Sequence, residues 1–224
     1  MDIKPIETVY NGYRFRSRLE ARWAVFFTAL DIEWQYEPEG LELSDGTRWL
    51  PDFYLPDFDT YVEVKADTTE SIPDIERIAK FIYWGSAVKR ILILSTIPDE
   101  IEDPGLWHFP CLCWSGIYDC VEVDWFFFSA AQNEDGTYRH NGHIGRNTYP
   151  SPFCFDNNGK VKTRPYKPWT LSAKSDWILR GKAPTLQSIE DAMDYEMQHY
   201  YNGTVFKAIT KARQARFEHG EKPE

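Results

Sequence analysis

The chain has 224 residues and a net charge of −10, and its contents of hydrophobic (42%) and aromatic (16%) residues support a packed core and argue against general disorder. It contains no apolar run long enough to predict a membrane-spanning helix, and its first five residues lack the form of a signal peptide. Four cysteines without an export signal are typical of free thiols in a reducing compartment, so we expect a cytoplasmic protein.

A helix is predicted to begin after Ser17, because the apolar residues that follow recur at helical spacing. These residues are Leu19, Trp23, Phe26, Phe27 and Leu30. Ser17 is a preferred N-cap residue, and Glu20 stands three positions later, where a capping box would place it. Glu20 also lies at the edge of the apolar stripe, which would point its carboxylate toward the sheet on which the helix packs. Two interpretations stay open: Glu20 caps the helix only, or it serves as an accessory acid of a site on that sheet.

Four arginines crowd the start of this predicted helix: Arg14, Arg16, Arg18 and Arg22. A phosphate at that end would meet cationic side chains and the free amides of a helix N-terminus. These arginines are therefore candidate nucleic-acid-binding residues. The alternative is an ordinary solvated basic face.

Residues 49–55 and 61–65 are rich in aromatic and branched residues and are predicted to form two strands, joined by turn residues at 56–60. Side chains alternate along a strand, so Glu63 and Lys65 would share one face while Val62 and Val64 occupy the other. A hairpin with this turn would bring Asp52 beside Glu63, with Lys65 next along the strand.

Two neighbouring carboxylates repel each other, and their burial favours a compensating cation. Mg²⁺ or Mn²⁺ fits the oxygen ligands of Asp52 and Glu63, and the backbone carbonyl of Val64 would supply another. Such an ion would polarise a phosphodiester and activate a bound water, while Lys65 would orient that water or neutralise developing charge. The alternative is an exposed strand face with an unremarkable Glu-x-Lys pair.

A helical segment at 72–84 and a buried strand at 90–95 follow. In this order, residues 10–97 resemble the PD-(D/E)XK nuclease superfamily, which has the restriction-endonuclease-like fold. Asp52 and the Glu63-Val64-Lys65 run match the superfamily motif, and Glu20 matches its optional helix-borne glutamate. Residues 15–24 and 36–40 are also similar to uncharacterised phage and prophage nuclease-like proteins.

The resemblance implies an α/β fold with a central mixed sheet flanked by helices, and hydrolysis of DNA with Mg²⁺ or Mn²⁺. Asp52 and Glu63 would be metal ligands, Lys65 the catalytic lysine and Glu20 an accessory acid near the metal. A bacterial or phage-infected cell would be the setting. Cutting both strands of a duplex usually takes two sites, so a homodimer is one expected assembly.

After residue 97 the sequence signals are weaker. We expect a nuclease core at 1–105, a β-rich appended region at 106–183 and a C-terminal helical segment at 184–224. That last segment should contain helices at 184–201 and from 204 to about 219. Cys111, Cys113, Cys120 and Cys154 do not have the paired spacing of a zinc site, even with the nearby histidines.

The acidic net charge argues against nucleic acid as a partner, but the charges are unevenly distributed. No Lys or Arg occurs between Arg90 and Arg139, whereas residues 160–182 are basic and contain interleaved aromatic residues. Candidate nucleic-acid-binding residues there are Lys160, Lys162, Arg164 and Lys167. Cations mixed with aromatic rings suit binding to a DNA strand. Ordinary basic loops are the alternative.

Three functions remain open on the sequence: a metal-dependent DNA endonuclease, an RNA-cleaving enzyme with the same chemistry, and a non-catalytic binding protein on a nuclease scaffold. The last would be an inhibitor of a defence protein or a DNA mimic that uses the acidic middle of the chain. The complete Asp52, Glu63 and Lys65 set favours the endonuclease.

Overall fold

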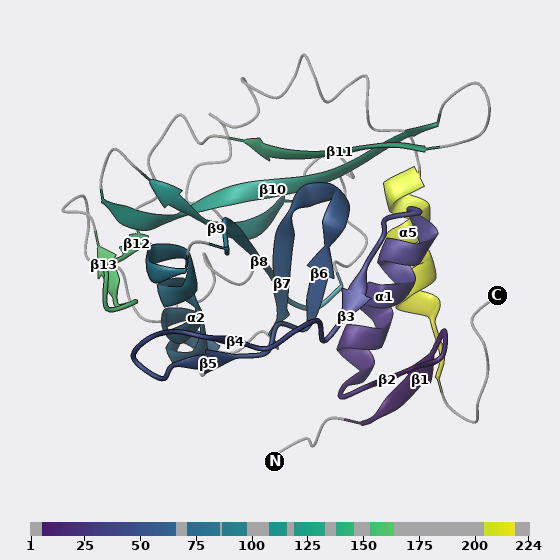
Figure 1. The fold of residues 1–224 in the computed structure, drawn as a ribbon. Coiled ribbons are helices and arrows are strands. Elements are labelled where there is room, and N and C mark those ends of the chain that lie inside the picture. The colour runs from purple at the N-terminus through teal and green to yellow at the C-terminus, as the bar shows by residue number, and fades with distance from the viewer. Residues whose placement is uncertain are drawn as a thin grey trace.

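A computed structural model describes residues 6–65, 71–85, 87–97, 108–115, 119–132, 138–145, 153–163 and 204–217 (Figure 1). In chain order the elements are β1 (Thr8–Tyr10), β2 (Tyr13–Phe15), α1 (Arg18–Ala29), β3 (Gln35–Tyr36), β4 (Leu41–Glu42), β5 (Arg48–Trp49), β6 (Phe53–Leu55), a 3₁₀ turn (Pro56–Phe58), β7 (Thr60–Val64), α2 (Ile72–Trp84), β8 (Arg90–Leu94), β9 (His108–Ser115), β10 (Cys120–Gln132), β11 (Tyr138–Gly145), β12 (Phe153–Phe155), β13 (Val161–Thr163) and α5 (Thr204–Gln214).

Among the described residues, nine strands form one mixed sheet in the order β13-β12-β10-β9-β8-β7-β6-β3, with β11 also paired to β10. Strands β7 and β8 run parallel, and the other paired strands of this sheet run antiparallel. Helix α2 provides the crossover between the two parallel strands, as a βαβ unit requires. The prediction of a mixed α/β fold is confirmed at this level.

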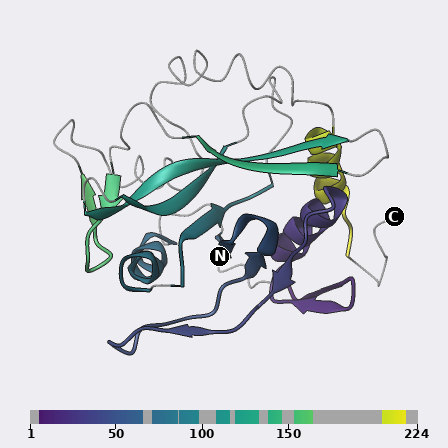
Figure 2. The same ribbon diagram turned by 45° about the horizontal axis from the view of Figure 1, so that its top comes forward.

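Helices cover both faces of the sheet, which makes three layers (Figures 1 and 2). Helices α1 and α5 share one apolar core with Phe53 of β6 and Val62 of β7. Helix α2 shares the second core with Ile91 and Ile93 of β8 and with Trp49. Because side chains alternate along each strand, neighbouring residues of β8 contribute to opposite cores.

Helix α1 begins where the sequence predicts. Ser17 is its N-cap, and the Ser17 Oγ accepts a hydrogen bond from the Glu20 backbone N–H at 3.2 Å. Trp23 and Phe27 are fully buried one helical turn apart, so the predicted apolar stripe is the face that packs on the sheet.

The predicted hairpin around Asp52 and Glu63 is present, with one difference. Residues 49–55 do not form a continuous strand, because Pro51 has no N–H to donate to a ladder and separates Trp49 from β6. Trp49 instead pairs with Leu41 in the separate hairpin β4–β5. The predicted strand at 61–65, the helix at 72–84 and the strand at 90–95 correspond to β7, α2 and β8.

The β-rich region continues the same sheet, because β9 pairs antiparallel with β8. The predicted boundary at residue 105 therefore lies between two strands that are hydrogen-bonded neighbours. Gly159 turns β12 back toward β13 with a φ of +72°, and a Cβ there would lie 2.1 Å from the Glu76 carbonyl oxygen of α2. Glycine is required at this position both by the backbone conformation and by the close contact.

Helix α5 ends at Gln214, earlier than the predicted position near 219. Its apolar residues Val205, Ile209 and Ala212 are buried in the core that it shares with α1. The predicted helix at 184–201 lies outside the described residues. Within the described ranges, no helix has the length and apolar character needed to cross a membrane.

Candidate functional site

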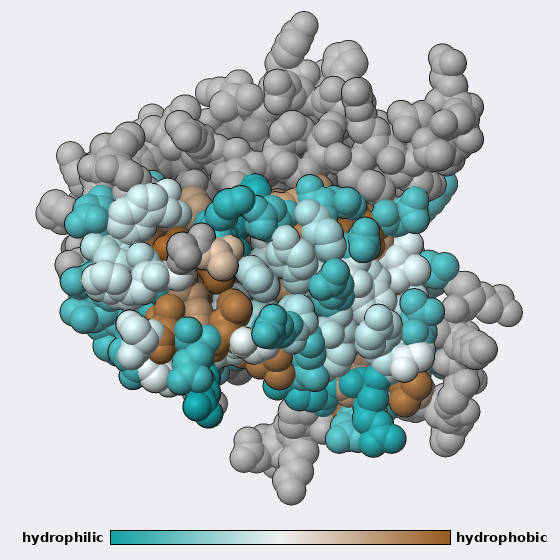
Figure 3. All heavy atoms as spheres, viewed as in Figure 1, coloured by the Kyte–Doolittle hydropathy of each residue, from teal (hydrophilic) through white to brown (hydrophobic). Residues whose placement is uncertain are grey.

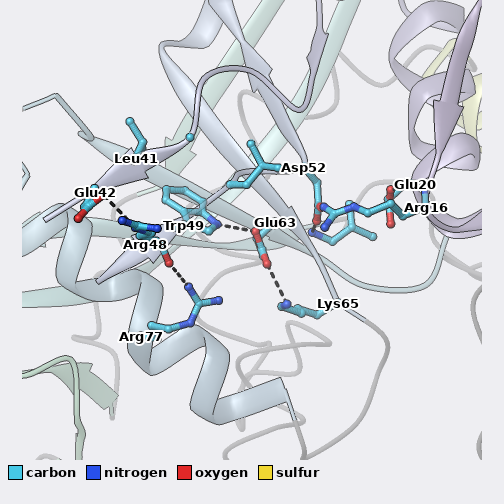
Figure 4. A pocket seen from close by; sticks show the side chains of 13 residues that line it. Arg16, Glu20, Leu41, Glu42, Arg48, Trp49, Asp52, Glu63, Lys65 and Arg77 are labelled. Atoms are coloured by element: carbon cyan, nitrogen blue, oxygen red, sulfur yellow. Dashed lines mark hydrogen bonds and ion pairs between the residues drawn. The ribbon is translucent and has the colours of Figure 1, made fainter. Parts of the chain in front are cut away.

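Asp52 and Glu63 lie opposite each other and line one open cavity of about 800 Å³ (Figure 4). The antiparallel register of β6 and β7 pairs Phe53 with Val62, which sets Asp52 across from Glu63 on the next rung. Both carboxyl residues are only 5% exposed. The pair predicted from the hairpin pattern is therefore brought together.

Each Asp52 carboxylate oxygen has a defined partner. Oδ2 accepts a hydrogen bond from the Val64 backbone N–H at 2.7 Å, and Oδ1 accepts one from Arg16 Nη2 at 2.6 Å. Burial, and secondly the nearby charge of Glu63, raise the pKa of Asp52 to about 8. A divalent cation would reverse this shift, because it favours the charged carboxylate.

Glu63 is held by two donors from different parts of the fold. Trp49 Nε1 donates to its Oε2 at 2.7 Å, and Lys65 Nζ lies 2.8 Å from its Oε1. Lys65 also donates to Asp74 Oδ2 on α2 at 3.0 Å. Burial alone would lower the pKa of Lys65, but attraction to Glu63 and these hydrogen bonds outweigh it and raise that pKa. Lys65 is therefore a fixed cation and not a proton acceptor in this arrangement.

Glu20 makes the contacts expected of a helix cap and also lies where an accessory acid of the site would lie. Its Oε1 accepts a hydrogen bond from Ser17 Oγ at 2.7 Å, as a helix cap would, and its backbone N–H is capped by the same serine. Its Oε2 accepts hydrogen bonds from Tyr36 Oη at 2.7 Å and from the Arg16 backbone N–H at 3.2 Å. Burial and the hydrogen bond to Glu20 raise the pKa of Tyr36, so this hydroxyl stays a donor. Glu20 also lines the cavity that contains Asp52.

Of the four arginines at the start of α1, Arg16 lines the cavity, where it bridges Asp52 and Glu37, and its side chain is 56% exposed. Arg14 is exposed on β2 and lies 3.5 Å from Glu7. Arg18 and Arg22 are half-buried on α1, and the buried Nε of Arg22 has no hydrogen-bond partner within the described part of the chain.

The second set of predicted basic residues is only partly described. Lys160 is exposed and lies 2.6 Å from Glu76, an ion pair that ties the β12–β13 turn to α2. Lys162 belongs to β13, but its side chain is outside the described part of the structure. Arg164 and Lys167 lie outside the described residues.

The donor set at Asp52 and Glu63 fits Mg²⁺ or Mn²⁺. Two carboxylates face one cavity, and the Val64 N–H points toward Asp52, so the Val64 carbonyl faces the same strand edge. Mg²⁺ commonly uses one or two carboxylates and completes its shell with water and phosphate oxygens. No group of three or more His, Cys, Asp or Glu side chains suited to a metal occurs among the described residues, so this site would depend on those extra oxygens.

Four residues around the carboxylates were not identified from the sequence: Trp49, Asp74, Arg48 and Arg77. Trp49 holds Glu63, and Asp74 holds Lys65. The sequence places Asp74 in the first turn of a helix, which is also its ordinary position as a helix-stabilising acid. Arg48 and Arg77 carried no spacing signal, because they reach the cavity from a hairpin and a helix that are distant in sequence.

Cys111, Cys113, Cys120 and Cys154 form no disulfide bond with one another or with any other described residue. Three of them, Cys111, Cys120 and Cys154, are buried. A buried cysteine packs like a small hydrophobic side chain, so burial gives these residues a packing role without any metal.

Comparison with known proteins gives no relative: no family model matches this chain, and neither the curated proteins nor the solved structures contain a match. A function for this chain must therefore be argued from its own sequence and from the geometry of the site.

Proposed function

We propose that this protein is a metal-dependent DNA endonuclease with a restriction-endonuclease-like core. The observation that supports the proposal is the buried pair Asp52 and Glu63, which lines one cavity together with Lys65. Burial of two carboxylates is unfavourable unless a cation compensates them. The alternative of an exposed, solvated strand face is inconsistent with their 5% exposure.

In this proposal Asp52, Glu63 and the Val64 carbonyl hold Mg²⁺ or Mn²⁺. When bound, such a cation supplies Lewis-acid polarisation of the phosphate and lowers the pKa of a coordinated water. Lys65 Nζ lies 2.8 Å from Glu63 Oε1 and donates a hydrogen bond to Asp74 on α2, so its ammonium is held beside the carboxylate pair. Its ammonium would hold the attacking water in position and balance the negative charge that develops on the phosphate oxygens.

Arg16 would hydrogen-bond to Asp52 while the protein is free of metal. The Arg16 guanidinium lies between Asp52 and Glu37, at 2.6 Å and 2.7 Å, so it has an acidic partner on each side. A cation at Asp52 would weaken the first contact and leave the second. Arg16 could then contact substrate phosphate from the mouth of the cavity.

The test is a cleavage assay with supercoiled, linear, branched and single-stranded DNA and with RNA, in Mg²⁺, Mn²⁺ and EDTA. We expect cleavage of DNA only with metal, and a loss of at least about 10²-fold in Asp52→Ala and in Lys65→Ala. The matched control is Lys89→Ala. Lys89 is paired with Asp59 and lies just before β8, whereas the carboxylate site lies at the other end of that strand, near Leu94.

Equal metal-dependent cleavage by wild type, Asp52→Ala and Lys65→Ala would refute the catalytic assignment. Cleavage confined to RNA would move the substrate to the second enzyme class and leave the roles of the residues unchanged. Circular dichroism and thermal unfolding of each variant would separate loss of chemistry from loss of fold.

One observation favours the non-catalytic alternative. Arg16 and Lys65 already provide each carboxylate with an internal cationic partner, so the site can exist as an ion-pair network without metal. Isothermal titration with Mn²⁺ separates the two candidates, because a purely structural network would not bind the ion, whereas the nuclease site must.

A further inference from the structure

Charged side chains line the cavity in three groups. Asp52, Glu63 and Lys65 occupy the centre (Figure 4). Arg16 and Glu20 stand at one end, and Arg48, Arg77 and Glu42 stand at the other. The proposed catalytic groups involve only the centre and the Arg16 end. The Arg48–Arg77 end is a separate feature, built by the β4–β5 hairpin and α2.

Arg48 and Arg77 are held close to each other. Arg77 Nη1 donates to the Arg48 backbone carbonyl at 2.5 Å, and Arg77 Nη2 lies 3.5 Å from Asp74. Arg48 Nε lies 2.9 Å from Glu42 Oε2, and the Arg48 side chain is 79% exposed. Both guanidinium groups carry a positive charge at this end of the cavity, and each can donate hydrogen bonds to an anion there.

An anion can readily displace Glu42 from its ion pair with Arg48. Both side chains are largely exposed, and exposed ion pairs contribute little free energy. A phosphate that reached Arg48 would replace one exposed carboxylate with a bidentate ligand.

Apolar side chains adjoin these arginines. Leu41 and Leu50 also line the cavity, and Leu50 is 41% exposed. Hydrophobic residues also gather over α2 and the β4–β5 hairpin on the surface of this face (Figure 3). A nucleotide presents a phosphate beside an apolar sugar edge and base face, which matches this combination of groups.

We propose that Arg48 and Arg77 form a phosphate subsite for the nucleotide next to the scissile bond. A single DNA strand would then run along the cavity from Arg16, over Asp52 and Glu63, to Arg48 and Arg77. The inference rests on the proposed nuclease function for the position of the scissile phosphate, but the strand-binding path is testable without cleavage.

The experiment measures binding of a fluorescently labelled single-stranded DNA oligonucleotide by anisotropy, in EDTA and on the Asp52→Asn background. No cleavage can occur under these conditions, and one source of repulsion with phosphate is removed. We expect Arg48→Ala to weaken binding about five- to tenfold and to reduce the slope of log affinity against log salt by about 0.7.

Lys89→Ala is the matched control, because it removes one exposed, ion-paired cation outside the cavity. It should leave affinity and salt slope nearly unchanged. Arg77→Lys is the second variant: it keeps the charge but not the planar fork, and should weaken binding less than Arg48→Ala. Thermal unfolding checks that each variant is folded.

Equal effects of Arg48→Ala and Lys89→Ala, or no effect of either, would overturn the subsite. The two proposals fail separately. Absence of metal-dependent cleavage together with a specific loss of affinity in Arg48→Ala would refute the nuclease but keep the strand-binding path. Cleavage that depends on Asp52, with normal DNA binding by Arg48→Ala, would refute the subsite alone.

Discussion

The two faces of the β6–β7 hairpin bury side chains of opposite chemistry. On the α1 face, Phe53 and Val62 are fully buried among apolar residues. On the other face, one residue away in each strand, Asp52 and Glu63 are buried almost as completely. The same backbone therefore carries a core and a carboxylate pair back to back.

Burial has opposite energetic consequences on these faces. A buried Phe or Val side chain stabilises the fold by about 1.5–3 kcal/mol, whereas a buried carboxylate costs free energy unless charge and hydrogen bonds compensate it. Arg16 and Lys65 provide only part of that compensation from within the chain, because the pKa of Asp52 is still raised. The α1 face therefore stabilises the fold, whereas the burial of the two carboxylates opposes it.

The largest expected effects come from substitutions of two neighbouring residues, Phe53 on the apolar face and Asp52 on the acidic face. Phe53→Ala should destabilise the protein by about 3–5 kcal/mol, because it leaves a cavity in the core. Asp52→Asn, in metal-free protein at pH 8, should instead stabilise it by on the order of 1–3 kcal/mol. Urea unfolding in EDTA measures both, and a destabilised Asp52→Asn variant at pH 8 would contradict the assignment of the acidic face.

The pH dependence gives this prediction its sign. The folded-state pKa of Asp52 is raised from the ordinary 3.8 to about 8, so the folded protein binds more protons than the unfolded chain between these values. Wild-type stability should therefore fall as pH rises from about 4 to about 8, and the advantage of Asp52→Asn should grow over that window.

Asp59 is the control with the opposite sign. Its hydrogen bond to Lys89 lowers the pKa of Asp59, so Asp59→Asn should lower stability slightly at neutral pH and have no effect at low pH. Asn tolerates the left-handed φ of +47° at this position.

Added Mg²⁺ should stabilise wild type more at pH 8 than at pH 6, because protons compete with the cation for Asp52. It should not stabilise Asp52→Asn, which lacks the charged ligand.

A pair of tryptophans offers a smaller and more selective comparison. Trp49 donates its indole N–H to Glu63 at 2.7 Å, whereas Trp23, in the other core, donates to the Ser95 carbonyl at 2.8 Å. Trp49→Phe and Trp23→Phe should each cost about 1–3 kcal/mol of stability, because the buried Glu63 carboxylate or the half-buried Ser95 carbonyl loses its donor.

Only Trp49→Phe should weaken Mn²⁺ binding, by about tenfold or more, since it alone loosens a proposed metal ligand. Isothermal titration reports the affinity, and urea unfolding reports the stability. Identical Mn²⁺ affinities in wild type and Trp49→Phe would show that Trp49 only packs.

The smallest expected effect concerns the two interpretations of Glu20. Ser17→Ala should cost about 1 kcal/mol through loss of the N-cap, and should change cleavage little. Glu20→Gln keeps the backbone cap from Ser17 but removes the charge beside the cavity, so we expect it to lower the cleavage rate more than Ser17→Ala does. Equal cleavage rates in the two variants would leave Glu20 as a helix cap alone.

Much of the local structure was predictable. Ser17 caps the start of α1, the apolar stripe of Trp23 and Phe27 faces the sheet, and Lys65, one residue past β7, lies beside Glu63. These features follow from helical and strand periodicity, which act over a few residues. The position of Asp52 beside Glu63 was also predictable, because one turn joins their strands.

Two features of the structure were not predicted, and the end of α5 at Gln214 lies earlier than expected. Trp49 belongs to a separate hairpin and not to the strand of Asp52, because Pro51 interrupts the ladder. The β-rich region extends the core sheet through the β8–β9 pairing, a contact that no local pattern encodes. The position of β9 beside β8 depends on the whole topology, which a window of sequence does not contain.

Residue periodicity and turn chemistry by themselves determined the helix cap, the hairpin and the carboxylate pair with its lysine. Only the tertiary structure decided which groups surround that pair: Arg16 on Asp52, 36 positions away, and Trp49 on Glu63, 14 positions away. The physical reason is range. Backbone stereochemistry is set by adjacent residues, whereas charge compensation in a buried site depends on side chains that meet only after the sheet and its helices have packed.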